Sequence, residues 1–307
     1  MAWKPIVVGI DSSPEAAWAG AVGANLANTA GTSCQLVHAA RDVLTAFAMA
    51  ELPEQAQELS ESHLAQAKDE VQHGLWGIVP PELAEHLMIR PGRPTWVLKE
   101  VATELDAGLI VLGGKHHTLL ERWFAGSTAL NVARTTDVPL FVTGGLRAPI
   151  RRILVAADQS YAAQPTIKTA ERFATLLGAE LRVMCAFEPL PILPDAPTYD
   201  VESYYTLLDE HVKREVWPLV LDPSAEKITR HGLAFDAIAR EVADWHADLL
   251  VVGSHGKGFV DRLLIGSVTE RLLNQLPTSL LVVPAHAPVT VKAAERSGVS
   301  RAEPAFT

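Results

Sequence analysis

Leu249–Gly256 (LLVVGSHG) and, after nine intervening residues, Gly266–Leu273 (GSVTERLL) form the stretch that decides the fold of this chain. The apolar run LLVV is typical of a strand covered on both faces. Glycines at a strand-to-helix junction let backbone N–H groups approach a phosphate, and the helix N-terminus adds about half a positive charge. Ser267 stands where an N-cap hydroxyl would stand. The stretch predicts a phosphate-binding loop that needs no lysine or arginine. A plain turn with a capping serine is the alternative.

The sequence contains an internal repeat that covers most of its length. The segments Ile6–Asp11 and Ile153–Asp158 correspond, and their aspartates lie 147 positions apart. Gly113 and Gly253 also correspond, at an offset of 140 positions. The first half therefore carries seven more residues than the second between its second and third predicted strands.

Each half shows the same order of predicted elements. A strand ends in aspartate and is followed by a helix, a second strand, a long connection with an amphipathic helix, a third strand, a helix, a fourth strand, the glycine loop, a helix and a fifth strand. The predicted helices include 15–29, 95–105, 162–177 and 234–245, and the third to fifth strands are 87–90, 109–112 and 140–143, then 227–230, 249–252 and 280–283. This alternation predicts βαβ units and a parallel sheet, with ligands beyond the carboxyl ends of the strands.

Composition narrows the class of protein. The 307 residues are 48% hydrophobic and carry a formal net charge of −10, which argues against binding to nucleic acid. No apolar run approaches the ~18 residues that span a bilayer, so we expect no membrane partner and a cytoplasmic location. The two cysteines, Cys34 and Cys185, suggest no disulfide framework and are expected to be small buried residues. The scattered tryptophans are expected to pack in the core or at an interface.

The aspartate-terminated strand, the glycine loop and the closing apolar strand resemble the universal stress protein family. The resemblance covers nearly the whole chain as two domains in tandem, residues 1–147 and 148–287, followed by a tail at 288–307 that we expect to be disordered. It implies an α/β fold of two five-stranded, parallel, Rossmann-like domains, related to the adenine nucleotide alpha hydrolases. The apolar fifth strands should pair within the chain as a pseudo-dimer, because pairing hides exposed strand edges. A homodimer of the whole chain is compatible with this arrangement.

The resemblance also implies a ligand and its site. In nucleotide-binding members of the family the ligand is ATP, here with or without Mg²⁺. Carried onto this chain, Asp158 faces the adenine or ribose, the backbone of Ala186 bonds the adenine edge, Val252 packs beside the ribose and Gly232 lines the pocket. The phosphates are surrounded by Gly253, Ser254, His255, Gly256, Gly266, Ser267 and Val268. We predict no catalytic and no metal-ligating residue.

The first half departs from the loop pattern. It reads Gly113–His117, then Gly126, so His116 stands where the second half has its second glycine. A side chain at a position that needs a positive φ is disfavoured. We therefore predict that the first domain does not bind ATP. Two alternatives stay open for this loop, an anion site made by the side chains of Lys115 and His116, and a metal site at His116 and His117.

These observations favour a regulatory, stress-response module that binds an adenine nucleotide in its second domain. A slow ATPase and a carrier of an apolar or lipid-like ligand are the alternatives. The proline-rich stretch 188–197 beside the adenine site is either a pocket wall or a linker. The charged segment 51–75 is expected to be an amphipathic helix packed on the sheet, with a partner-binding helix as the alternative. Arg90 and Arg93 stand near the first pocket, where exposed arginines sometimes attract an anion.

Overall fold

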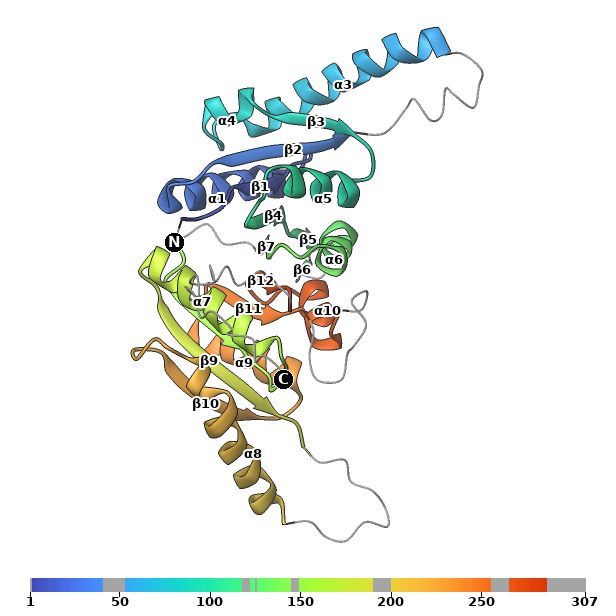
Figure 1. The fold of residues 1–307 in the computed structure, drawn as a ribbon. Helices are drawn as coiled ribbons and strands as arrows, with labels where there is room; N and C mark the ends of the chain where they lie inside the picture. Colours follow the sequence, from blue (N-terminus) through green and yellow to red (C-terminus); the bar gives the residue numbers. More distant parts are fainter. Residues whose placement is uncertain are drawn as a thin grey trace, which may run out of the picture.

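The computed structural model of the chain describes residues 2–40, 53–117, 122–124, 126–144, 149–189, 200–254 and 265–285. Its centre is one sheet of ten strands in the order β10-β9-β8-β11-β12-β7-β4-β1-β2-β3 (Figure 1). Each half of this sheet contains five parallel strands, and the two halves meet between β12 and β7. The predicted α/β fold with two tandem domains and an intrachain pseudo-dimer is confirmed.

The first domain runs from the N-terminus to β7. Its strands and helices, in chain order, are β1 (Ile6–Gly9), α1 (Pro14–Ala30), β2 (Cys34–Ala40), α3 (Pro53–Leu75), α4 (Pro81–Glu85), β3 (Met88–Pro91), α5 (Pro94–Glu104), β4 (Leu109–Gly113), β5 (Lys115–His117), β6 (Arg122–Phe124), α6 (Gly126–Thr135) and β7 (Leu140–Thr143).

The second domain repeats this order without a counterpart of the β5–β6 hairpin among its described residues. Its elements are β8 (Arg152–Ala156), α7 (Ala163–Leu177), β9 (Glu180–Phe187), α8 (Val201–Glu215), the short 3₁₀ helix η1 (Trp217–Leu219), β10 (Glu226–His231), α9 (Ala234–Trp245), β11 (Leu249–Gly253), α10 (Ser267–Asn274) and β12 (Ser279–Val283).

The registers of the two domains are equivalent. Val8 pairs with Leu36 in the first domain, and Val155 pairs with Val183 in the second, as the 147-residue offset requires. His38 of β2 therefore occupies the same place in the first domain as Cys185 of β9 in the second.

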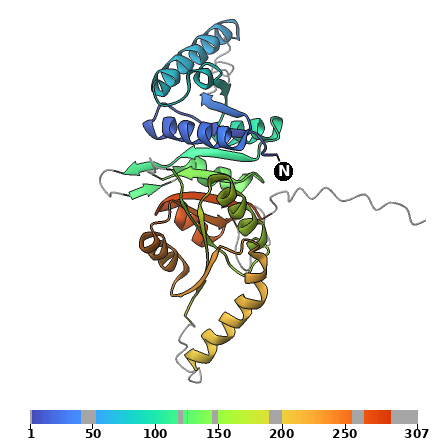
Figure 2. The same cartoon turned by 90° about the vertical axis from the view of Figure 1, so that its left-hand side faces the viewer.

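Two hydrophobic cores cover the two faces of the sheet. On one face, side chains such as Val8 and Val155 pack with α1, α3, α7 and α8. On the other face, side chains such as Val7 and Leu154 pack with α5, α6, α9 and α10. The alternation of side chains along each strand sends neighbours to opposite faces, and both faces are buried, which explains the continuous apolar runs in the sequence. Figure 2 shows the helices on both sides of the sheet.

The domains join through an antiparallel pair of apolar strands. Phe141 of β7 lies opposite Leu281 of β12, and both side chains are almost completely buried. These two residues are 140 positions apart, so the junction is centred on equivalent positions and relates the domains as a pseudo-dimer. Trp3 adds a contact at the other side of the junction, because its ring meets Phe173 of α7 edge-on at 5.3 Å and lies under the guanidinium of Arg172.

Local signals set the ends of the helices that follow the first strand of each domain. Ser13 caps α1 and is followed by Pro14, the residue whose fixed φ suits a first helical position. Gly31 and Gly178 end α1 and α7 with φ of 62° each, in the left-handed region that glycine adopts without strain.

The structure tests several smaller predictions. The amphipathic helix predicted at 51–75 is α3, whose Val71 and Leu75 are buried against the core. Cys185 is buried and Cys34 half-buried, neither of them forms a disulfide, and burial raises the pKa of the Cys34 thiol to about 12. The proline-rich stretch beyond residue 189 and the tail at 288–307 lie outside the described residues.

Two of the seven tryptophans lie outside the core, so for them the prediction of packing at an interface remains. Trp76 follows α3 and is 85% exposed, and Trp96 on α5 is 66% exposed. Both occupy positions that the helix periodicity turns away from the sheet. Among the described helices, none is both long and apolar enough to span a membrane.

Candidate nucleotide-binding site

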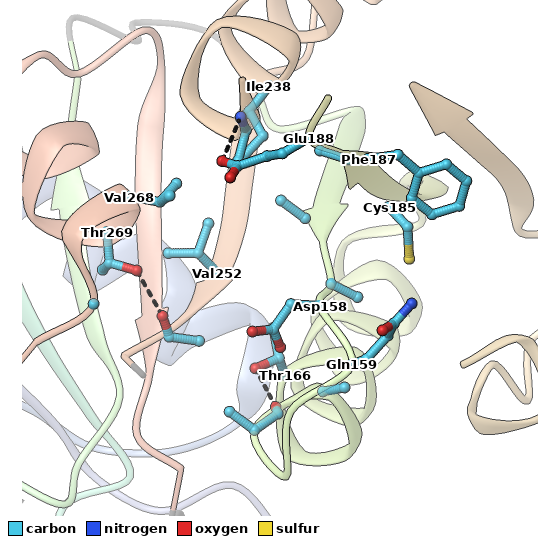
Figure 3. A pocket seen from close by; sticks show the side chains of 18 of the residues that line it. Asp158, Gln159, Thr166, Cys185, Phe187, Glu188, Ile238, Val252, Val268 and Thr269 are labelled. Atoms are coloured by element: carbon cyan, nitrogen blue, oxygen red, sulfur yellow. Dashed lines mark hydrogen bonds between the residues drawn. The ribbon is translucent and has the colours of Figure 1, made fainter. Parts of the chain in front are cut away.

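A cavity of about 400 Å³ lies at the carboxyl ends of β8, β9 and β11 in the second domain. This is the position that a parallel α/β sheet offers to ligands. Its lining comes from those strand ends and from α7, α8, α9 and α10 (Figure 3). The residues are Ala156, Ala157, Asp158, Gln159, Ala162, Ala163, Thr166, Cys185, Ala186, Phe187, Glu188, Tyr204, Leu208, Ala234, Ile238, Val252, Gly253, Gly266, Ser267, Val268 and Thr269.

Seven residues singled out from the sequence line this cavity together. They are Asp158, Ala186, Val252, Gly253, Gly266, Ser267 and Val268. Ser254 is buried next to the cavity, where its N–H donates to Val283 O and its carbonyl accepts from Gly266 N–H. Gly232 ends β10 with a φ of 128° and donates to Phe187 O, outside the lining. His255 and Gly256 lie outside the described residues.

Asp158 is held rigidly at the end of β8. Its Oδ1 accepts hydrogen bonds from the backbone N–H of Ser160 at 3.0 Å and from the Ser160 hydroxyl at 2.5 Å. The Ser160 hydroxyl in turn accepts from Ala162 N–H, directly before α7. The local sequence thus fixes the carboxylate at the mouth of the cavity instead of leaving it to rotate.

The N-terminus of α10 opens into the cavity. Gly266 is its N-cap residue, and no side chain of the described residues caps this end of the helix. Thr269 donates through Oγ1 to Gly253 O at 2.8 Å, which fastens the first turn of α10 to the end of β11. The first N–H groups of a helix have no partner within the helix. They are aimed here, with the positive end of the helix dipole, at the cavity floor.

The N-terminus of α9 opens into the same cavity but is already occupied. The carboxylate of Glu188, one residue beyond β9, accepts from Ala234 N–H at 3.3 Å. Glu188 therefore acts as a capping anion for α9 from a distant part of the chain. Within the part of the chain that the structure describes, α9 has a capping side chain and α10 has none.

The remaining walls are mostly apolar. Val252 and Ile238 lie on one side in Figure 3, and Phe187 and Cys185 lie on another. Tyr204 and Leu208 of α8 complete the enclosure, and the Tyr204 hydroxyl donates to Glu188 O at 3.4 Å. Sequence reasoning missed the α8 wall because the segment between the second and third strands is where the repeat loses its register.

The first domain has a smaller cavity at the equivalent strand ends, with a volume of about 130 Å³. Its lining includes Asp11, His38, Leu112, Gly126 and Ser127. The His38 ring fills the place of Cys185 and hydrogen-bonds Ile10 O through Nδ1 at 2.8 Å. The chain beyond Gly114 forms the antiparallel hairpin of β5 and β6, with His116 in an extended strand.

The charges in the second-domain cavity are negative. Its described lining contains the carboxylates of Asp158 and Glu188 and no lysine, arginine or histidine. The described residues also contain no group of three His, Cys, Asp or Glu side chains placed to hold a metal ion. A polyanion in this cavity would depend on backbone N–H groups.

Comparison with known proteins finds a matching family model and a related sequence. Residues 2–144 and 149–284 each match the sequence model of the universal stress protein family. A curated relative from Thermus aquaticus, named as a universal stress protein in the QAH/OAS sulfhydrylase 3′ region, is 30% identical over 135 residues. That alignment covers 43% of this chain and 98% of the relative.

Solved structures share the fold of this chain. The crystal structure of a universal stress protein from Archaeoglobus fulgidus DSM 4304 covers 92% of this chain and 98% of its own, with a TM-score of 0.60 and 15% identity. A universal stress protein crystallised in complex with cAMP is 25% identical, over 44% of this chain and 98% of that chain, with a TM-score of 0.32.

Proposed function

The chain belongs to the universal stress protein family, as two domains in tandem, and on that premise we propose that its second domain binds one molecule of ATP. The bound nucleotide would act as a regulatory signal in a cytoplasmic stress response, and the first domain would serve as an empty structural partner. The contrast between the two cavities supports the assignment of nucleotide binding to the second domain and of a structural role to the first.

The uncapped N-terminus of α10 carries the proposal. Gly266, Ser267 and Val268 bring the start of this helix to the cavity, where backbone N–H groups and the helix dipole favour a phosphate. The neighbouring α9 cannot offer the same site, because Glu188 already occupies its first N–H group. The phosphates are therefore assigned to α10, and the nucleoside to the remainder of the cavity.

The rest of the cavity suits a nucleoside. Its volume of about 400 Å³ lies within the range of small-molecule sites, and its walls are mainly apolar. The backbone of Ala186 at the end of β9 offers polar groups to an adenine edge. Asp158 Oδ2, on the carboxylate whose Oδ1 accepts from Ser160, is placed to accept from ribose hydroxyls or the adenine amino group.

A Mg²⁺ ion would be held by the phosphates and water, because the described residues supply no cluster of ligands for it. Hydrolysis needs a group that positions water and groups that neutralise the transition state. The two carboxylates of the described lining both have other hydrogen-bond partners, and the described lining supplies no cation beside them. The site thus favours binding over turnover, and a slow ATPase stays the weaker alternative.

Gly266→Asp is the variant that tests the proposal. Gly266 has φ −59° and ψ 141°, which any residue adopts, and aspartate is a favoured N-cap. The substitution should therefore keep or slightly raise thermal stability while it places a carboxylate where the phosphates bind. We expect ATP affinity, measured by isothermal titration calorimetry, to fall by about a hundredfold or more, because the new carboxylate repels the negative phosphates and also blocks an N–H group at the helix N-terminus.

Gly266→Asn is the matched control, since it caps the helix without a charge. It should bind ATP more weakly than wild type and more tightly than Gly266→Asp. Unchanged affinity in a folded Gly266→Asp protein would refute the phosphate position. Wild-type protein that binds no adenine nucleotide and releases an apolar molecule on denaturation would favour the carrier alternative, which the apolar walls also support.

A further inference from the structure

A second and larger cavity lies away from the nucleotide site, beside the junction of the two domains. It is a groove of about 480 Å³, and we call it the α5–α6 groove. Its described lining comes from two helices of the first domain and from the ends of β11 and β12 of the second. The residues are Arg93, Thr95, Trp96, Lys99, Asn131, Ala133, Arg134, Thr135, Thr136, Asp137, Ser254, Pro284 and Ala285.

The groove combines positive charge with an exposed aromatic ring. Arg93, Trp96 and Lys99 follow each other at intervals of three along α5, so they share one side of that helix. Trp96 is 66% exposed, although tryptophan usually buries its large ring. Among the described residues, neither Arg93 nor Lys99 has an ion-pair partner.

The opposite wall is polar and nearly neutral. Arg134 on α6 pairs with Glu270 of α10 at 3.0 Å, so its charge is largely compensated. Asp137, just beyond α6, is the carboxylate of the described lining. Asn131 and Thr135 add hydrogen-bonding groups one helical turn apart. The groove is therefore locally cationic on its α5 side, on a chain whose formal net charge is −10.

The equivalent place in the second domain is filled by that domain's own side chains. There Arg271 of α10 lies 3.9 Å from the ring centroid of Phe235 and 3.5 Å from the Asp236 carboxylate of α9. These contacts close the gap between α9 and α10. In the first domain the corresponding positions are Asn131, Thr95 and Trp96, which make no such bridge, and the gap stays open.

We propose that the α5–α6 groove is a second ligand site, which takes a small anion that carries a flat aromatic ring. The anionic group would bind Arg93 and Lys99, and the ring would stack on the indole of Trp96. The combination of an unpaired guanidinium, an ammonium and an exposed indole selects for both features at once. An anion without a ring would lack the stacking contact with Trp96, and an uncharged ring would lack the contacts with Arg93 and Lys99.

The test uses naphthyl phosphate as the probe and the full-length protein. The indole N–H signal of Trp96 is assigned in an isotope-labelled sample by comparison with Trp96→Phe. The probe is titrated without ATP, because ATP also carries an anion and an aromatic ring, and Gly266→Asp serves as the background that suppresses binding in the nucleotide cavity. We expect the Trp96 signal to shift and saturate. Arg93→Gln combined with Lys99→Gln should weaken binding roughly tenfold, the sum expected for two exposed charge contacts.

Inorganic phosphate and naphthol separate the two parts of the recognition. Both should bind markedly more weakly than naphthyl phosphate. Arg240→Gln is the matched control, because it removes an exposed cation from α9, the equivalent helix of the second domain, and it should leave the affinity unchanged. The proposal is overturned if the Trp96 signal does not move, if naphthol binds as tightly as naphthyl phosphate, or if the α5 double variant binds like wild type.

Discussion

The two domains have the same strand order and the same register, yet their cavities differ threefold in volume. The cavity at the strand ends of the second domain measures about 400 Å³, and that of the first about 130 Å³. Their scaffolds are equivalent, so the difference must come from individual side chains and from the loop after the fourth strand.

Two substitutions change the lining of the first cavity. His38 stands in the first domain where the second has Cys185, and its ring lines the cavity. Leu112 stands where the second domain has Val252. It packs into the space left by Gly9, because a Cβ added to that glycine would lie 2.4 Å from a methyl carbon of Leu112.

The entry into the last helix differs as well. Gly126 begins α6 with a φ of 74°, whereas Gly266 precedes α10 with a φ of −59°. The first-domain chain runs from Gly113 to α6 through the β5–β6 hairpin. A repeat thus preserves the scaffold, while a few positions at the strand ends decide whether a cavity remains open.

The largest effect is expected from the junction that both domains share. Phe141→Ala removes a ring that is 1% exposed and lies opposite Leu281, and such truncations cost about 3–5 kcal/mol. Denaturant unfolding should show lower stability for the whole chain in a single transition, and Leu281→Ala should act in the same way. An unfolding curve in which one domain keeps its wild-type midpoint would show that the domains are stabilised independently.

A smaller effect is expected from exchanging one residue of the cavity. Cys185→His brings the first domain's side chain into the second domain, and overfilling a packed site costs about 2 kcal/mol, or roughly thirtyfold in affinity. Calorimetric titration with ATP measures this loss. Cys185→Ala is the control, since it leaves the cavity open and should bind ATP about as well as wild type. Full affinity in Cys185→His would mean that the ring at this position does not explain the empty first domain.

The smallest change in stability is expected from substitutions at two equivalent helix ends. Gly31 and Gly178 have the same φ of 62°, and a Cβ added to either meets no atom within 4 Å. Alanine at either position should cost about 1 kcal/mol, from the left-handed backbone alone. Thermal unfolding should show similar decreases for Gly31→Ala and Gly178→Ala. Clearly unequal decreases would show that one helix contributes more to the shared stability than the repeat suggests.

The sequence predicts the scaffold well because the scaffold depends on repeated, local signals. The apolar runs, the aspartates at the strand ends and the glycines after α1 and α7 each have a local physical role, and the offsets of 147 and 140 residues align them. The seven lining residues from Asp158 to Val268 follow from the same logic, since they stand at strand ends or at the start of a helix.

The parts that were missed depend on contacts distant in sequence. Glu188 caps α9 across 46 residues, and its position follows only once β9 and β10 are paired. The α8 wall with Tyr204 arises where the repeat has no register to follow. Trp96 was expected to pack in the core or at an interface, and its exposure follows from which side of α5 meets the sheet. The glycine pattern showed only that His116 stands in place of the second glycine of the loop, and the structure forms the β5–β6 hairpin there.

The most direct test of the central claim is a count of nucleotides per chain. Freshly purified protein is denatured, the released small molecules are identified by mass spectrometry, and the emptied protein is titrated with ATP. We predict one adenine nucleotide site per chain, which Gly266→Asp removes. Two sites per chain, neither of them in the α5–α6 groove, would contradict the account of the filled first domain, and a chain that binds no adenine nucleotide at all would contradict the proposed function.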